Sequence, residues 1–393
     1  MKNKFSARYS IYILLLLSLP LNLEAKINKL KVPNGFQVEI FINNIEKPRG
    51  LTSDDEGNIF IGSSSNFAYL ITKSKNIYTI ASNLQKPIGI SYFNNKLYIS
   101  SVNKIYVVQD VEKEINNTVN ANQPYKWKME EFVILPDTNS KIHAGRYIKV
   151  DKRNENLIVN IGSPSNARIP KEEHEAVLLG INLATKEKNI VEYGVRNSVG
   201  FDFHPIDNYL YFSDNGRDHL GDNLPPDEIN LVSKYGEHFG FPYVFGKNRK
   251  DPSFFLKAPK NIDFTPAIYE LPAHVAPLGI HFYKGNMFPS EYKNKLFIAE
   301  HGSWNSTVPV GYRITTLDIN SNTKTVTNYK IFLEGLLTSD GSKIGRPVDI
   351  ITYWDGSILF SDDFGNKIYG YTTTNYNCHD KVQVQVHHYY DHY

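Results

Sequence analysis

Four groups of polar residues have types and spacings that could carry chemistry. His143 stands in Lys141-Ile-His-Ala-Gly-Arg146, and an imidazole with a pKa near about 6.5 is suited to accept a proton at neutral pH. A turn histidine bonded only to the backbone is the alternative. Arg196 and Asn197 offer fixed guanidinium and amide donors, which suit an anionic or carbonyl-rich ligand, and a structural ion pair is the alternative.

The third group is an acidic loop that begins at Asp214-Asn-Gly-Arg-Asp218 and carries five carboxylates up to Glu228. Hard oxygen donors on an irregular, glycine-containing loop suit Ca²⁺, whose ligands include backbone carbonyls as well as carboxylates. The spacing does not match an EF-hand loop. A solvated acidic loop without a metal is therefore the alternative.

The fourth group consists of His301-Gly-Ser-Trp304 and Gly345-Arg-Pro347. Trp304 could stack on a planar ligand, and Arg346 could pair with a carboxylate. In isolation, a packed aromatic residue and a surface ion pair are the simpler explanations of these two side chains.

The elements that must position these groups form a repeat. Each unit has a turn ending in glycine, an alternating apolar strand, a polar turn and a second strand. The unit occurs six times, at residues 47–63, 86–101, 143–162, 197–214, 276–300 and 345–362. Gly50 and Gly89 lie 39 residues apart, which suits a four-stranded blade, and longer gaps later in the chain indicate inserted loops.

This repeat predicts an all-β fold, a single six-bladed β-propeller with strands throughout. A ring needs one strand to join its ends, and Gly35–Ile42 near the N-terminus is favoured over Val382–Val386 near the C-terminus. Ligands gather at one end of a propeller channel. Since His143, Arg196, Asn197 and Arg346 stand at or beside unit starts, they are expected to share one channel mouth.

Composition limits the possible partners. The 393 residues are 41% hydrophobic, which is enough for a large core, and the net charge of +2 gives no reason to expect nucleic acid as a partner. Cys378 is the single cysteine, so no intrachain disulfide can form.

The first 25 residues are typical of a signal peptide, because basic residues precede a short apolar run and Ala25 offers a cleavage point. An uncleaved membrane anchor is the alternative, although the run is shorter than the roughly 20 residues that span a bilayer. We therefore expect a periplasmic or secreted chain with no membrane span after cleavage. The domain is expected over residues 26–378, followed by a His/Tyr-rich tail at 379–393 that either binds metal or is solvated.

Nearly the whole mature chain resembles the pyrroloquinoline quinone (PQQ) dependent sugar dehydrogenases, especially the glucose/sorbosone dehydrogenase branch. The segments that carry the resemblance are Gly194-Val-Arg-Asn-Ser-Val-Gly200, Ser213-Asp-Asn-Gly-Arg-Asp218, Pro226-Asp-Glu-Ile-Asn230, Phe239-Gly-Phe-Pro242, His301-Gly-Ser-Trp304 and Gly345-Arg-Pro-Val-Asp349. A six-bladed propeller with PQQ and Ca²⁺ across its channel mouth is the fold that this resemblance implies.

The resemblance also implies residue roles. His143 would be the general base that takes a hydroxyl proton from the substrate as hydride passes to the quinone. Arg196 and Asn197 would contact the quinone oxygens and stabilise the charge that develops there, which gives Arg196 a catalytic role. Arg196, Asn197, His301, Trp304 and Arg346 would bind the cofactor, and the backbone carbonyls of Gly216 and Arg217 would hold Ca²⁺. Soluble glucose dehydrogenases have a lysine near the position of His301 and a second arginine near that of Arg346, and both are missing from these places here.

The function expected is oxidation of an aldose or related aldehyde, with electrons passed to an external acceptor. No Gly-x-Gly-x-x-Gly stretch between a strand and a helix is present, which counts against a nicotinamide or flavin cofactor. Two other classes stay open: a binding propeller that has lost its cofactor, and a Ca²⁺-dependent hydrolase of the lactonase type.

Overall fold

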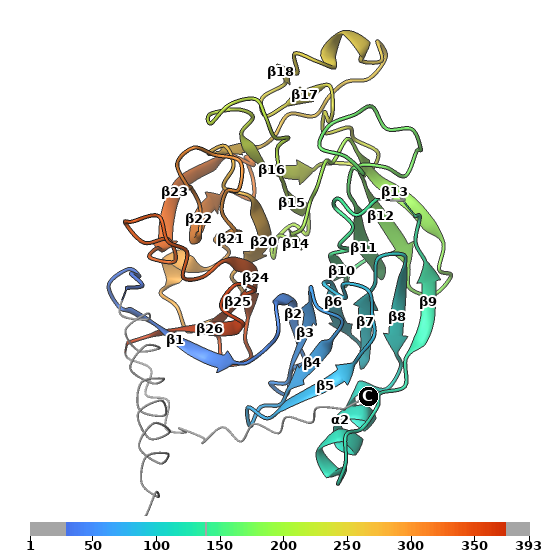
Figure 1. The fold of residues 1–393 in the computed structure, drawn as a ribbon, viewed down its shortest axis with the longest axis vertical. Helices are drawn as coiled ribbons and strands as arrows, with labels where there is room; N and C mark the ends of the chain where they lie inside the picture. Colours follow the sequence, from blue (N-terminus) through green and yellow to red (C-terminus); the bar gives the residue numbers. More distant parts are fainter. Residues whose placement is uncertain (1–28, 138–139, 375–393) are drawn as a thin grey trace, which may run out of the picture.

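The computed structural model describes residues 29–137 and 140–374, which form six four-stranded antiparallel sheets arranged in a ring (Figure 1). This confirms the six-bladed β-propeller. In each blade the innermost strand belongs to the first half of a sequence unit and the next strand to its second half. The predicted signal peptide and the His/Tyr tail lie outside the described residues.

Each of the first five blades uses four strands in chain order. Blade 1 contains β2 (Pro48–Ser53), β3 (Ile59–Ser63), β4 (Ala68–Ile71) and β5 (Ile77–Ala81). Blade 2 contains β6 (Ile90–Phe93), β7 (Lys96–Ser100), β8 (Lys104–Val108) and β9 (Glu130–Ile134). Blade 3 contains β10 (Ile148–Asp151), β11 (Asn156–Ile161), β12 (Val177–Asn182) and β13 (Lys188–Tyr193). Blade 4 contains β14 (Phe201–Phe203), β15 (Leu210–Asp214), β16 (Asp227–Val232) and β19 (Tyr269–Leu271). Blade 5 contains β20 (Pro277–Phe282), β21 (Leu296–Glu300), β22 (Arg313–Ile319) and β23 (Val326–Leu333).

Blade 6 joins the two ends of the chain. It contains β24 (Pro347–Thr352), β25 (Ile358–Asp362), β26 (Lys367–Thr373) and, outermost, β1 (Phe36–Asn43). β1 runs antiparallel to β26, from Phe36 opposite Thr373 to Asn43 opposite Lys367. The N-terminal closing strand is therefore confirmed (Figure 1), while Val382–Val386 lies outside the described residues.

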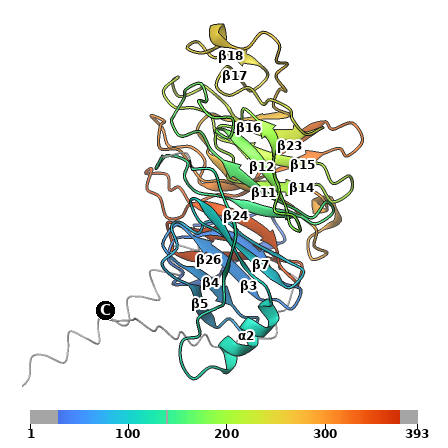
Figure 2. The ribbon, with the colours of Figure 1, turned by 90° about the vertical axis from the view of Figure 1, so that its right-hand side faces the viewer.

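Some inserted segments depart from the expected all-strand pattern. The helix α2 (Val111–Asn120) follows β8, with Asp110 as its cap, and short 3₁₀ turns occur at η1 (Phe255–Lys257) and η2 (Ser290–Tyr292). The hairpin of β17 (Val244–Phe245) and β18 (Arg249–Lys250) extends from blade 4. α2 and this hairpin lie at opposite ends of the molecule's long axis (Figure 2). No helix among the described residues is long and apolar enough to cross a membrane.

The repeat glycines allow neighbouring inner strands to approach closely. A Cβ added to Gly89 would lie 2.2 Å from the carbonyl oxygen of Arg146, and one on Gly200 would lie 2.1 Å from that of Leu278. The starts of successive inner strands thus lie at one level of the channel. We call this end the near mouth, and the end where the inner strands finish the far mouth.

Candidate active site

His143 lies in the turn before β10, at the near mouth, with a backbone φ of 49°. Its Nδ1 lies 2.7 Å from the carbonyl oxygen of Ser163. Because a carbonyl only accepts, Nδ1 carries the proton and Nε2 keeps a free lone pair. Burial, reinforced by the nearby Arg196, lowers the pKa of His143 to about 3. The ring is therefore neutral at pH 7 and able to accept a proton.

Arg196 precedes β14 and is 5% exposed. Its Nε donates to the Asn166 carbonyl at 2.8 Å, and one Nη donates to the Asn215 carbonyl at 3.0 Å. The other Nη contacts Asn166 Oδ1 at 2.9 Å and Asp218 at 3.4 Å. One N–H of the guanidinium remains for a ligand. Arg196 thus holds the surrounding loops together as well as supplying charge.

Asn197 is brought next to His143. The backbone amide of Arg196 donates to one carboxylate oxygen of Asp214 at 2.8 Å, and that of Asn197 donates to the other at 2.6 Å. A Cβ added to Gly162 would lie 2.7 Å from the Cβ of His143 and 3.3 Å from Oδ1 of Asn197. Glycine at position 162 therefore lets the two side chains stand side by side.

Gly216 and Arg217 lie in the loop after β15. The Gly216 amide donates to Asp227 at 2.7 Å, and one Nη of Arg217 contacts both carboxylate oxygens of Asp251, at 3.0 and 3.2 Å. No hydrogen bond from the described residues reaches the carbonyl oxygen of either residue. These oxygens are therefore open to a cation.

The carboxylates of the acidic loop serve a different purpose. Asp214 and Asp227 are buried and accept backbone amides, which fixes the loop. Glu228 is also buried and accepts the Gly246 amide at 2.5 Å. In the described part of the chain, no three His, Cys, Asp or Glu side chains are grouped to hold a metal. A cation in this loop would depend on backbone oxygens.

A second charged group surrounds His301, whose Nδ1 lies 2.9 Å from the Pro347 carbonyl. Arg346 Nε and an Arg49 Nη donate to opposite oxygens of Asp363, at 2.8 and 2.7 Å. Burial lowers the pKa of His301 to about 3; Asp363 opposes this shift, and the two guanidinium groups reinforce it. Two cations thus share one carboxylate, which leaves positive charge at the near mouth.

Arg49 is the residue that the sequence reasoning missed. Its Nε is buried and has no hydrogen-bond partner among the described residues. The sequence did contain a signal for this arginine. Arg49 stands directly before the repeat glycine of its unit, and at that position other copies of the unit carry the apolar residues Ile88, Val199 and Leu278. It comes from blade 1 and supplies a second arginine beside Arg346 from the opposite end of the chain.

Trp304 stands apart from both groups. Its side chain is 73% exposed, and its ring meets that of His219 edge to face with centroids 6.0 Å apart. The exposed ring of Trp304 is not packed in the core, so a planar ligand could stack on it. No described contact joins Trp304 to His143 or Arg346.

The chain is similar to several known proteins. A family model described as TrAA12-like matches residues 30–252 and 258–369. An uncharacterized protein of Borreliella burgdorferi is 66% identical over 373 residues, covering 94% of this chain and 98% of that protein.

The pyrroloquinoline quinone-dependent pyranose dehydrogenase of Coprinopsis cinerea is 23% identical over 348 residues, covering 74% of this chain and 45% of that enzyme. The chain thus matches about half of that relative. The holo form of its PQQ domain has a TM-score of 0.70 at 18% identity, covering 87% of this chain and 97% of the domain. A calcium structure of the Trichoderma reesei family AA12 protein has a TM-score of 0.69 at 18% identity, covering 88% and 97%.

Proposed function

The chain belongs to the TrAA12-like family, and from this premise we propose that it is a PQQ- and Ca²⁺-dependent dehydrogenase. The substrate would be an aldose sugar or a related aldehyde, oxidised at the hemiacetal or carbonyl carbon. An external acceptor would take the electrons. We further propose that the chain is exported, with residues 1–25 as its signal peptide, and works in the periplasm or outside the cell.

The near mouth fits an anionic quinone with three carboxylates and a divalent cation. Arg49 and Arg346 share the single carboxylate of Asp363, so charge remains for ligand carboxylates. The buried Nε of Arg49 has no partner among the described residues, which is unusual for a charged group. The open carbonyls of Gly216 and Arg217 suit Ca²⁺.

When bound, PQQ would supply the hydride acceptor and Ca²⁺ would polarise it. His143 would take the proton of the substrate hydroxyl at Nε2, since the Ser163 carbonyl holds the other nitrogen protonated. Arg196 and Asn197 would donate to the ligand oxygen on which charge develops. His301 offers an acceptor near the two arginines, and exposed Trp304 offers a stacking surface.

The observation that carries this proposal is the neutral His143, with Nε2 free, beside Arg196 and Asn197. His143→Ala should reduce turnover by about a hundredfold or more with PQQ, Ca²⁺, an aldose and a reducible dye, because the proton acceptor is lost. PQQ binding, followed by its absorbance, should be largely retained. Loss of binding without a separate effect on turnover would give His143 a structural role.

The same assay separates the other two classes. A propeller without a cofactor would neither bind PQQ nor reduce the dye with any sugar or aldehyde in a substrate panel. A lactonase-type hydrolase would cleave a lactone with Ca²⁺ alone.

A further inference from the structure

An inserted segment of blade 4 stands out from the ring. It covers residues 244–266, between β16 and β19, and contains the β17–β18 hairpin followed by the 3₁₀ turn η1. The segment projects at one end of the molecule's long axis (Figure 1 and Figure 2). We call it the blade-4 arm, and its outer part around η1 the tip.

The base of the blade-4 arm is anchored to the propeller. Asp251 is buried, its amide donates to the Tyr243 carbonyl at 2.9 Å, and its carboxylate accepts from one Nη of Arg217 at 3.0 and 3.2 Å. The Asn248 side chain donates to the Phe264 carbonyl at 3.1 Å. These contacts tie the two ends of the arm together, so the tip is presented in a fixed direction.

The tip exposes an apolar side chain. Leu256, in the middle of η1, is 97% exposed, more than any other large apolar residue in the described part of the chain. The neighbouring Phe255 is partly buried, and Lys250 Nζ lies 4.4 Å from the centroid of its ring. A single exposed leucine is common on protein surfaces. The charges around Leu256 therefore decide which partner the tip suits.

Positive charge remains on the blade-4 arm when all of its acidic groups are counted. The arm carries five basic and two acidic side chains. Asp251 is paired with Arg217 at 3.0 Å, and Arg249 with Glu270 at 2.9 Å. The side chains that remain are one exposed carboxylate, Asp263, and four exposed lysines, Lys247, Lys250, Lys257 and Lys260. The adjoining turn at 233–237 adds one lysine and one glutamate, which balance.

Three of these lysines border the tip. Lys257 follows Leu256 directly, Lys250 contacts the ring of Phe255, and Lys260 lies three residues beyond Lys257. None of the three forms an ion pair with another described residue. Their ammonium groups are therefore available to an anionic partner.

This arrangement suits a lipid bilayer better than a protein partner. Protein interfaces are depleted in lysine and bury about 800 Å² on each side, more than a single loop tip offers. At an anionic bilayer, lysines meet the lipid phosphates while an apolar side chain enters the boundary between headgroups and acyl chains. A projecting tip, unlike a groove, can reach that boundary.

We propose that the blade-4 arm attaches the folded protein reversibly to a bilayer that contains anionic lipid. Leu256 would enter the headgroup boundary, with Lys250, Lys257 and Lys260 at the lipid phosphates. One leucine and three lysines together give weak binding, so neither contribution is sufficient alone, and added salt should weaken the attachment. This attachment does not depend on the proposed dehydrogenase chemistry.

Co-sedimentation with lipid vesicles tests the proposal. The chain from Lys26 onward is used, because it retains all six blades and lacks the apolar run at residues 11–17, which could bind lipid itself. Vesicles of phosphatidylcholine with about one third phosphatidylglycerol are compared with vesicles of phosphatidylcholine alone, at low salt. We expect at least about tenfold tighter binding to the mixed vesicles, and loss of most of this preference at about 0.5 M salt.

Two variants test the two parts of the tip. Leu256→Asp should weaken binding to the mixed vesicles about tenfold or more, because it replaces the inserted apolar group with a charge that the bilayer repels. Lys257→Glu should also weaken it about tenfold or more, since it reverses a charge at the lipid phosphates. Unchanged melting temperatures should show that both variants fold.

Matched controls make the same changes elsewhere. Ile206→Asp alters another exposed apolar residue, in the turn after β14, and Lys330→Glu reverses an exposed lysine of β23. Both should bind as the wild type does. The proposal fails if the wild type does not bind the mixed vesicles, if it binds phosphatidylcholine equally well, or if either tip variant keeps the wild-type affinity. Equal losses in the controls would also contradict it, because the contact would then not be specific to the arm.

Discussion

Arg49 and Arg346 act as a pair at the scale of single residues. They hold opposite oxygens of Asp363 and lie beside the neutral His301. The pKa of Asp363 falls to about 2 although burial alone would raise it, because the guanidinium groups of Arg49 and Arg346 favour its charged form. Asp363 is therefore an anchor that remains ionised at neutral pH.

Arg49→Met should weaken PQQ binding about tenfold or more, because one charge-assisted contact to a ligand carboxylate is lost. The dissociation constant can be measured by PQQ absorbance or by activity against PQQ concentration. Arg49→Lys should recover part of the affinity, since it keeps the charge without the planar fork. Equal affinity in Arg49→Met and wild type would contradict a role in binding.

His143 should remain neutral in mildly acidic solution. Its pKa is lowered to about 3 by burial and by Arg196, so the folded protein binds this proton far less readily than the unfolded chain. The contribution to stability is complete above about pH 6.5 and is lost progressively as pH falls toward 3. Imidazole NMR shifts of the cofactor-free protein, assigned with His143→Gln, should show no titration between pH 8 and about 5. A midpoint near 6.5 would contradict this.

Strand β13 contains a buried acid that is unrelated to the candidate site. Glu192 is fully buried, and neither of its oxygens accepts a well-formed hydrogen bond from the described residues. Burial, reinforced by the nearby carboxylate of Glu237, raises the pKa of Glu192 to about 9. The backbone amide of Glu237 offsets only part of this rise. Glu192 is therefore protonated at neutral pH.

A carboxyl group whose pKa is raised by folding stabilises the fold at low pH, and this stabilisation is lost as the pH rises. For Glu192 the loss should begin near the unfolded pKa of about 4.3 and continue to about 9, at up to about 1.4 kcal/mol per pH unit. Glu192→Gln should flatten this pH dependence, because glutamine stays neutral. The free energy of unfolding in urea, measured from pH 5 to 9, provides the check. An unchanged slope would show that Glu192 ionises freely.

Closure of the ring is the feature that concerns the whole molecule. Phe36 of β1 packs edge to face against Phe288, Tyr292 and Phe332, with ring centroids 4.8 to 5.0 Å away. These partners belong to blade 5, so the closing strand of blade 6 also seals the contact between the two blades.

Phe36→Ala should lower the free energy of unfolding by about 3 to 5 kcal/mol, because it removes a buried aromatic ring and leaves a cavity. Thermal or urea unfolding measures the loss. Glu39→Ala, on the exposed side of the same strand, serves as the control and should change stability by less than about 0.5 kcal/mol. A similar effect from both substitutions would mean that β1 contributes little to closure.

The sequence by itself determined the propeller, its six units and its N-terminal closing strand. These features depend on alternation within strands and on glycine at fixed places in the turns, and both are visible locally. The positions of His143, Arg196, Asn197 and Arg346 at unit starts followed from the same repeat. The helix α2 did not, because it lies in an insertion outside the repeat.

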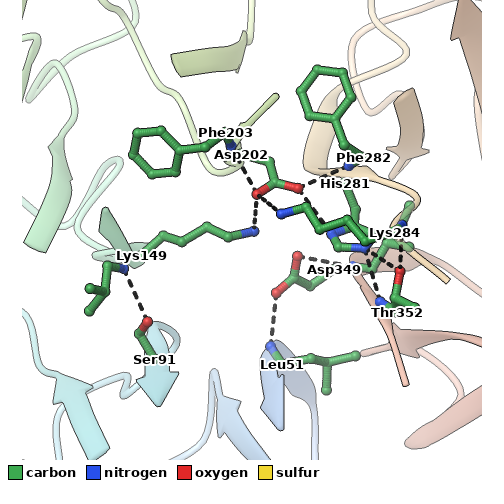
Figure 3. Close-up of polar contacts among 12 residues, drawn as sticks. Leu51, Ser91, Lys149, Asp202, Phe203, His281, Phe282, Lys284, Asp349 and Thr352 are labelled. Atoms are coloured by element: carbon green, nitrogen blue, oxygen red, sulfur yellow. Dashed lines mark hydrogen bonds and ion pairs between the residues drawn. The ribbon is translucent and has the colours of Figure 1, made fainter. Parts of the chain in front are cut away.

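The tertiary structure alone decided which groups meet across the ring. Arg49 and Asp363 are 314 residues apart in sequence, and only closure places them in contact. The free Nε2 of His143 depends on the carbonyl of Ser163, and the ion pairs of Lys149 and Lys284 with Asp202 join residues from three blades (Figure 3). Where groups from different blades meet, burial and neighbouring charges determine the protonation state of each group and the hydrogen-bonding capacity that it keeps free. No local pattern in the sequence encodes these properties.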